Sequence, residues 1–98
     1  MNFLSNLFFG NGPNEKPTFV MYHANWCGHC LTAKPTFKSL QTKYKSKIIF
    51  KDIEQKNIDS SVKIDGFPTF VLYAKNKKME YQGDRSVNSF SKFLDENI

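Results

Sequence analysis

The chain has few cysteines, a single arginine and no long apolar run. Each of these absences argues against one class of fold or function. Two cysteines in 98 residues exclude the disulfide framework that staples many small secreted domains. Arg85 is the only arginine among 14 Lys and Arg side chains, which disfavours phosphate recognition, because that chemistry uses forked guanidinium groups. No stretch approaches the roughly 20 apolar residues of a transmembrane helix. We therefore expect no specific nucleic-acid partner and no membrane association.

What is present suits an ordinary globular protein. The sequence is 40% hydrophobic, and ten phenylalanines supply much of its core volume. We expect one domain over residues 1–98, with no repeat or linker, acting as a monomer. The net charge of +5 is spread along the chain and indicates a solvated surface rather than a binding patch.

Neither end of the given sequence contains a recognisable targeting signal. No Lys or Arg precedes Lys16, so the basic start of a signal peptide is missing, and residues 95–98 are not a retention tetrapeptide. We expect a cytosolic location, with a virion or an oxidising compartment left open.

Hydrophobic periodicity and turn residues predict an α/β fold. The expected elements, in chain order, are a helix over 2–9, a strand over 18–23, a helix from the cysteine pair to about 45, a strand over 47–53, a short helix or turn over 55–63, strands over 69–74 and 79–82 around a turn at 75–78, and a last helix after Ser86. In this last helix Val87, Phe90, Phe93 and Leu94 share one apolar face, and Ser86 is its expected N-cap. This order implies a mixed sheet of about four strands with helices on both faces.

Both cysteines lie in one C-x-x-C segment, between a strand and a helix, which is the arrangement of a redox-active dithiol. Inert thiols and a metal site are the alternatives, but a zinc or iron–sulfur site normally needs four ligands. A structural disulfide would close too short a loop to restrain the unfolded chain much. At a helix N-terminus, the thiol pKa of Cys27 should fall below its free value of about 8.5. Cys27 is then the nucleophile, and Cys30, one turn later and more buried, resolves the mixed disulfide.

The residues around the cysteines have predicted roles as well. His29 brings partial positive charge to the thiolate and should make the disulfide more oxidising. Gly28 permits a tight turn and the close approach of substrate. Trp26 is expected as a partly exposed platform that shields the disulfide and touches substrate.

The segment Trp26-Cys27-Gly28-His29-Cys30 resembles the active site of protein disulfide isomerase domains in the thioredoxin superfamily. Pro35 resembles the family's proline that kinks the following helix. The segment 66–69, GFPT, resembles the loop in which a cis-proline, here Pro68, packs against the redox site. In that loop the backbone of the preceding residue, here Phe67, pairs with bound substrate.

The segment 81–85, YQGDR, resembles the isomerase Y-x-G-x-R. The resemblance implies that Arg85 approaches Cys30 and lowers its thiol pKa. It also implies protein thiol or disulfide substrates, a recycling reductase, oxidant or glutathione, and no cofactor beyond the Cys27–Cys30 couple.

The sequence also departs from the family pattern. The family has a buried acid six residues before the first cysteine, where this chain has Met21, which accepts no proton. Leu31 stands where Lys or Arg is usual. His23 replaces an aromatic residue and is interpreted as a core histidine, with a substitute proton carrier as the alternative. The N-terminus is too short for the first strand of the full fold.

These observations predict a thiol–disulfide oxidoreductase with an oxidase- or isomerase-like potential. A thioredoxin-like reductase of cytosolic proteins is the alternative within the same chemistry. From another class, a partner-binding module with weak redox activity stays open because of Met21. A metal-binding variant that shares a cluster across a dimer is the third alternative.

Overall fold

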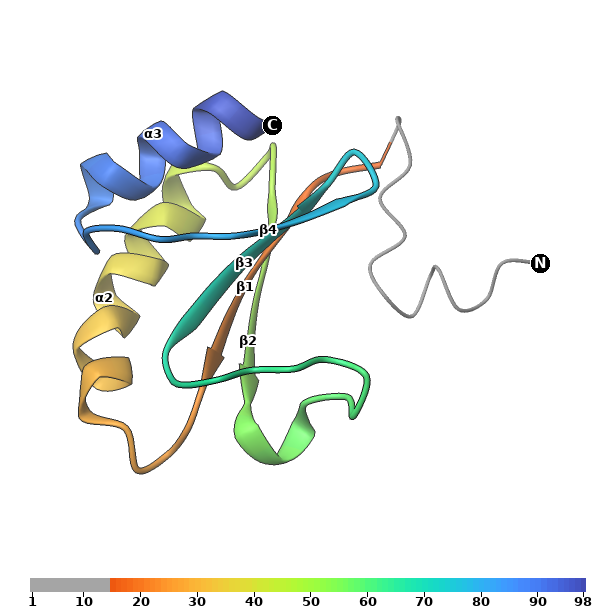
Figure 1. The fold of residues 1–98 in the computed structure, drawn as a ribbon. Helices are drawn as coiled ribbons and strands as arrows, with labels where there is room; N and C mark the ends of the chain where they lie inside the picture. Colours follow the sequence, from red (N-terminus) through yellow and green to blue (C-terminus); the bar gives the residue numbers. More distant parts are fainter. Residues whose placement is uncertain (1–14) are drawn as a thin grey trace.

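The structure, a computed structural model, describes residues 15–98 (Figure 1). Its elements are β1 (Thr18–His23), α2 (Gly28–Lys43), β2 (Ile49–Glu54), the 3-10 helix η1 (Gln55–Asn57), β3 (Thr69–Ala74), β4 (Lys77–Glu80) and α3 (Val87–Asn97). The predicted helix over 2–9 and the expectation about a first strand both concern residues outside this range. No helix within residues 15–98 is long and apolar enough to cross a bilayer.

The four strands form one mixed sheet in the order β2-β1-β3-β4. Strand β1 pairs in parallel with β2 and antiparallel with β3, and β4 extends the sheet antiparallel to β3. All six residues of β1 are buried, as the dense apolar and aromatic run predicts for a central strand. The parallel β1–β2 connection runs through α2, so the redox segment lies where β1 ends and α2 begins.

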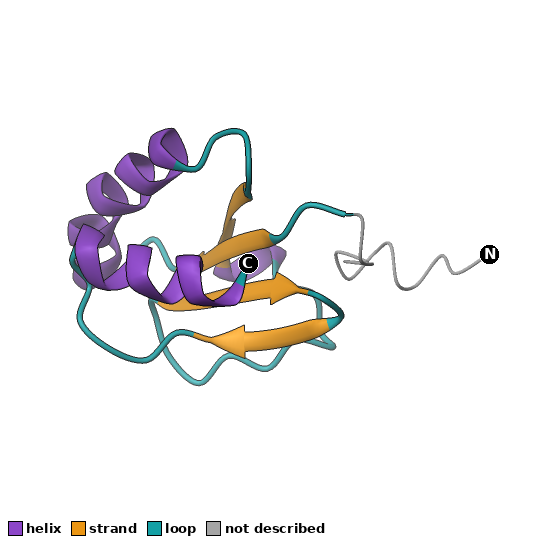
Figure 2. Ribbon diagram, turned by 90° about the horizontal axis from the view of Figure 1, so that it is seen from above, coloured by secondary structure: helices purple, strands orange, loops and turns teal. Residues whose placement is uncertain are grey.

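One face of the sheet carries both α-helices, which pack side by side (Figure 1 and Figure 2). The core on this face is centred on Phe19, which has no solvent exposure. Its ring lies 5.9 Å from that of Phe37 on α2, 6.1 Å from that of Phe70 on β3 and 5.9 Å from that of Phe90 on α3. Stacked and edge-on aromatic pairs of this kind add about 0.5–1.5 kcal/mol each beyond their area burial.

The opposite face is covered by the segment that follows β2, which Figure 1 shows on the far side of the sheet from α2 and α3. Ile58, Val62 and Phe67 from this segment pack on buried residues of β1 and β3. The hydroxyls of Tyr22 and Tyr73 are hydrogen-bonded at 2.7 Å beneath it. Burial raises the pKa of both phenols, since the charged form is the one penalised.

The predicted fold class is confirmed, with a difference in how the second face is covered. The short helix predicted within residues 55–63 is present as η1, but among the described residues this face carries no α-helix, whereas the sequence predicts helices on both faces. Strand β2 starts two residues later than predicted, and α2 ends two residues before Lys45. Such shifts are ordinary because helix and strand ends fray.

The structure corrects the predicted length of the turn between β3 and β4. The turn was expected over 75–78, but only Lys75 and Asn76 form it, and Ala74 pairs with Lys77. Both turn residues have positive φ, 54° and 61°, as a two-residue type I′ turn requires. Strand β4 therefore starts at Lys77 instead of residue 79. The polar composition of the segment hid the strand, because its side chains lie on a solvated edge.

The final helix agrees with the sequence in detail. Ser86 is its N-cap, and its Oγ accepts a hydrogen bond from the Ser89 backbone N–H at 3.1 Å. Phe90 and Leu94 are buried, and Val87 and Phe93 pack partly buried against the same core.

Candidate active site at the start of α2

Cys27 is the N-cap of α2, at the point where the chain leaves β1. Its φ and ψ of −93° and 109° are extended, and its Sγ accepts a hydrogen bond from the backbone N–H of Cys30 at 3.1 Å. The carbonyl of Ala24 accepts the N–H of Cys27 at 3.1 Å, which fixes the turn before the helix. A sulfur at an N-cap faces otherwise unpaired N–H groups, which favour negative charge on it. The prediction that the helix begins within the motif is confirmed.

The two cysteines form a disulfide with a Cα–Cα distance of 5.3 Å. Cys27 is 5% exposed and Cys30 is 1% exposed, so the first sulfur is the more accessible one. Both pack with Ala24 and with the partly buried Phe67 in a small cluster of their own. The spacing of one helical turn brings the sulfurs together without any rearrangement of the helix.

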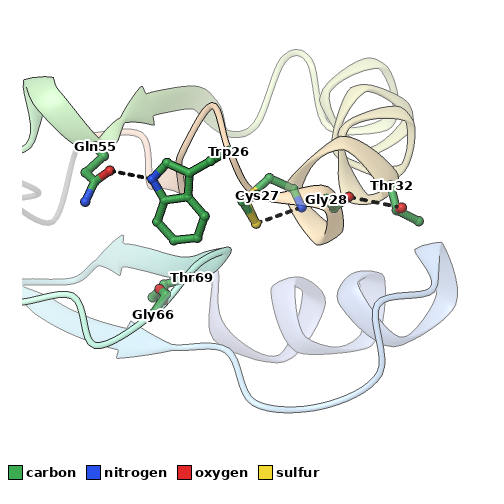
Figure 3. The surroundings of a disulfide bond; sticks show 8 residues. Trp26, Cys27, Gly28, Thr32, Gln55, Gly66 and Thr69 are labelled. Carbon is green, nitrogen blue, oxygen red and sulfur yellow. Dashed lines mark hydrogen bonds between the residues drawn. A yellow bond between two sulfur atoms is a disulfide. The ribbon is translucent and has the colours of Figure 1, made fainter.

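Trp26 is the most exposed of the large apolar side chains, at 72%. Its indole N–H donates to Gln55 Oε1 at 3.0 Å, which ties the redox segment to η1 (Figure 3). Its ring meets Phe67 edge-on, with centroids 5.8 Å apart. Gln55 had no predicted role, and no local pattern marks it, because its contact with Trp26 is made across 29 residues of sequence.

The segment before β3 approaches the site from the other side. The Phe67–Pro68 peptide bond is cis, and Pro68 is buried. The Thr69 hydroxyl donates to the carbonyl of Gly66 at 2.7 Å, which closes the loop around that bond (Figure 3). The structure thus brings Phe67 to the cysteine cluster, as the predicted site requires.

The remaining predicted site residues lie in more open surroundings. His29 and Arg85 are both exposed, the first in the opening turn of α2 and the second in the loop between β4 and α3. A Cβ atom built on Gly28 would meet nothing within 4 Å, and its φ lies outside the left-handed region. The predicted tight turn therefore does not need glycine here. The backbone at Gly28 instead borders open space beside the disulfide.

Met21 and His23 are both buried on β1. Met21 has no exposure and belongs to the aromatic core with Phe19 and Phe37. His23 is 7% exposed and pairs in register with Glu54 of β2. Within residues 15–98, no three side chains of His, Cys, Asp or Glu are grouped so that they could hold a metal ion.

The comparison with known families agrees with this geometry. A family model described as Thioredoxin matches residues 5–96. The chain belongs to the thioredoxin family.

Curated relatives of this thioredoxin-family chain are protein disulfide-isomerases. The one from Saccharomyces cerevisiae is 40% identical over 90 residues, which cover 85% of this chain and 17% of the relative. That of Drosophila melanogaster is 38% identical over 88 residues, which cover 85% of this chain and 18% of the relative. The chain thus spans less than a fifth of the length of these relatives.

Solved structures show the same fold. The germline-specific thioredoxin protein Deadhead from Drosophila melanogaster superimposes with a TM-score of 0.73 at 25% identity, covering 87% of this chain and 84% of that one. The J-Trx1 fragment of ERdj5 gives a TM-score of 0.75 at 18% identity and covers 83% of this chain and 42% of that one. At 18% identity, the match to the ERdj5 fragment supports only a shared fold.

Proposed function

We propose that the chain, as one domain, exchanges disulfides with protein substrates through the Cys27–Cys30 couple. The observation that carries the proposal is the hydrogen bond from the Cys30 N–H to the Cys27 sulfur at the N-cap of α2. This bond and the helix dipole stabilise thiolate over thiol, and the thiolate is the form that attacks disulfides. The lower exposure of Cys30 supports its role as the second, resolving thiol.

The reaction has two exchange steps. The Cys27 thiolate attacks one sulfur of a substrate disulfide, and the other substrate sulfur leaves as a thiolate with the bonding electrons. Cys30 then loses its proton and attacks Cys27, so the Cys27–Cys30 bond forms while the bond from Cys27 to substrate breaks. The protein is oxidised and the substrate gains two electrons, and the reverse sequence oxidises a dithiol substrate.

Substrate binding is proposed for the exposed surface beside the sulfurs. Trp26 and Phe67 offer an apolar contact, the backbone before Pro68 offers hydrogen bonds to an extended chain, and Gly28 leaves room for its approach. A protein substrate is favoured because the exposed Trp26 ring offers an apolar contact at the surface. Recycling by a reductase, an oxidant or glutathione is proposed with it.

The direction of exchange is proposed to be oxidase- or isomerase-like. Reference potentials run from about −270 mV for thioredoxin to about −180 mV for protein disulfide isomerase. His29 is exposed between the two cysteines, where its partial charge stabilises the reduced form, and Arg85 is proposed to assist Cys30. A measured potential near the thioredoxin value would instead support the reductase alternative. A cytosolic location stays a prediction, to be tested by cell fractionation.

The decisive experiment compares two cysteine variants in an insulin-reduction assay. Cys27→Ser should abolish turnover, and Cys30→Ser should keep the first attack but accumulate a mixed disulfide on Cys27, visible by mass spectrometry. The mechanism fails if Cys27→Ser retains turnover, or if Cys30→Ser traps no adduct. Met79→Leu, a distant and partly buried substitution, controls for nonspecific loss of activity.

A further inference from the structure

Two ionisable side chains at the carboxyl ends of β1 and β2 have no part in the chemistry above. They are His23, which is 7% exposed, and Glu54, its register partner on the parallel strand. Oε1 of Glu54 is fully buried and has no hydrogen-bond partner among residues 15–98. Burial of a carboxylate oxygen without a hydrogen-bond partner is costly, because the oxygen loses its hydration and gains nothing in return. Such an atom inside a small domain asks for a functional explanation.

Both side chains belong to the face of the sheet that α2 covers. Residues alternate along a strand, and Phe19 and Met21 lie in the α2-side core, whereas Val20 and Tyr22 lie in the opposite one. His23 continues the first series. On β2, Phe50 packs into the α2-side core and Ile53 into the other, so Glu54 also continues the α2-side series.

The contact between β1 and α2 also shows which residue of the helix lies opposite His23. The rings of Phe19 and Phe37 are in contact, which aligns β1 with α2 at that point. From there, four strand residues reach His23 in about 13 Å, and seven helical residues reach Cys30 in about 10 Å. Cys30 belongs to the buried stripe of α2, so it faces the sheet. Met21 is about 7 Å along β1 from Phe19. Cys30, at about 10 Å, therefore lies between Met21 and His23 along the strand direction.

The resolving step needs a proton acceptor at this place. Cys30 is 1% exposed, so water has little access to its thiol when it must become a thiolate. Met21 has no basic atom. Of the two buried groups that bracket Cys30 along β1, only His23 can take a proton.

We propose that His23, next to Glu54 on the neighbouring strand, accepts the proton of the Cys30 thiol during resolution of the mixed disulfide, directly or through one water. The inference rests on the proposed disulfide exchange and deepens it. The S–H bond of Cys30 breaks, its proton passes to an imidazole nitrogen, and its electron pair forms the bond to Cys27 while the substrate sulfur leaves as a thiolate. The Glu54 carboxylate stabilises the imidazolium, and this supplies the partner that its buried oxygen lacks.

Other charged groups of the neighbouring elements are turned to solvent. Asp52 on β2 and His29 and Lys34 on the first turns of α2 are exposed, as is Lys56 on η1. On β1, the other titratable residue near this level is Tyr22, which lies on the opposite face and is bonded to Tyr73. None of these groups is therefore expected to take the Cys30 proton.

The test separates the two exchange steps in the 98-residue chain. Reduced protein is mixed with glutathione disulfide, quenched with acid at short times, and analysed by mass spectrometry from pH 5 to pH 9. The appearance of the glutathione adduct gives the rate of attack by Cys27, and its decay gives the rate of resolution by Cys30. The variants are His23→Phe, Glu54→Gln and, as a matched control, Tyr22→Phe, which removes a buried polar group on the opposite face.

His23→Phe should slow resolution by roughly 10²-fold at pH 7, the low end of the range for general acid–base catalysis, while attack changes less than about twofold. Its resolution rate should rise about tenfold per pH unit, because only the spontaneous thiolate then reacts. Glu54→Gln should slow resolution in the same direction, and Tyr22→Phe should alter neither step. Met21→Glu placed in the His23→Phe background should restore resolution by supplying another acceptor near Cys30.

Contrary outcomes are equally clear. Resolution within twofold of wild type in His23→Phe overturns the proposal, and so does equal slowing of both steps at every pH, which marks a structural role. If His23→Phe fails to fold, the Glu54→Gln rates and pH profile decide the matter alone. If wild type forms no adduct, disulfide exchange itself fails, whereas normal attack with unaffected variants removes only the role of His23.

Discussion

The two ends of the layer between β1 and α2 are built from the same strand and the same helix, yet they are packed in opposite ways. The far end is aromatic and fully satisfied, with Phe19 against Phe37 and the Tyr44 hydroxyl bonded to Asp95 Oδ1 at 2.7 Å. The redox end holds a buried histidine, an exposed Trp26 and a carboxylate oxygen that has no hydrogen-bond partner within residues 15–98.

This contrast shows how a small domain separates stability from reactivity. A fold of this size has only a modest free energy of unfolding, on the order of 5–15 kcal/mol. Buried polar groups and exposed aromatic rings lower this free energy of unfolding. They are confined to the redox end, and the aromatic core at the far end supplies the stability of the fold. Breaking each end in turn should therefore give different phenotypes.

The largest effect is expected from Phe19→Ala at the far end. Removing a ring with no solvent exposure from the centre of the aromatic core should lower the free energy of unfolding by about 3–5 kcal/mol. Urea denaturation followed by circular dichroism measures it. Trp26→Ala is the matched change at the redox end, where 72% exposure predicts a much smaller loss of stability but slower reduction of protein substrates. Equal losses in the free energy of unfolding for Phe19→Ala and Trp26→Ala would contradict the contrast between the two ends.

A smaller loss is expected from Tyr44→Phe, which keeps the ring and removes only the hydroxyl. That hydroxyl bonds Asp95 Oδ1 at 2.7 Å and the Ser91 carbonyl at 3.3 Å, and so joins the end of α2 to α3. The free energy of unfolding should fall by about 1–2 kcal/mol, as for hydrogen bonds that involve a charged partner. The rate of attack by Cys27 should stay at the wild-type value; a slower attack would show that the two ends are coupled.

Alkaline pH should destabilise the protein through its buried phenols. Burial raises the folded-state pKa of Tyr22, Tyr73 and Tyr44 above the unfolded value of about 10. Above that value the unfolded chain has released protons that the folded one still holds, so stability is full below about pH 10 and falls as the pH rises further. Denaturation midpoints measured from pH 8 to pH 11 check this, and Tyr22→Phe should flatten the slope. A midpoint independent of pH would contradict the assignment.

The smallest effect is a gain from Asn76→Gly in the β3–β4 hairpin. Asn76 has a φ of 61° in a type I′ turn, where glycine carries no steric penalty. The melting temperature should rise, by an amount equivalent to at most about 1 kcal/mol, because the left-handed conformation costs a residue with a Cβ more than it costs glycine. The change lies outside both ends of the β1–α2 layer, so activity should be unaltered. A lower melting temperature would mean that the Asn76 side chain contributes more than its backbone strain costs.

The sequence by itself determined the fold class, the order of elements and the redox pair. These depend on local signals: the buried run of β1, the two cysteines one helical turn apart, and Ser86 as the cap of α3. It placed the hairpin turn correctly at Lys75 and Asn76 but made it two residues too long, because only the pairing of β3 with β4 assigns the polar residues 77 and 78 to a strand.

Only the tertiary structure decided the contacts made across the chain. The bond from Trp26 to Gln55, the approach of Phe67 to the cysteines and the pairing of His23 with Glu54 join residues that are about 30 or more positions apart. No local pattern encodes such neighbours, because they depend on the register of β1 with β2 and on the path of the loop before β3. The sequence located the sulfurs, and the register of the strands placed His23 next to Glu54 at the same end of the sheet.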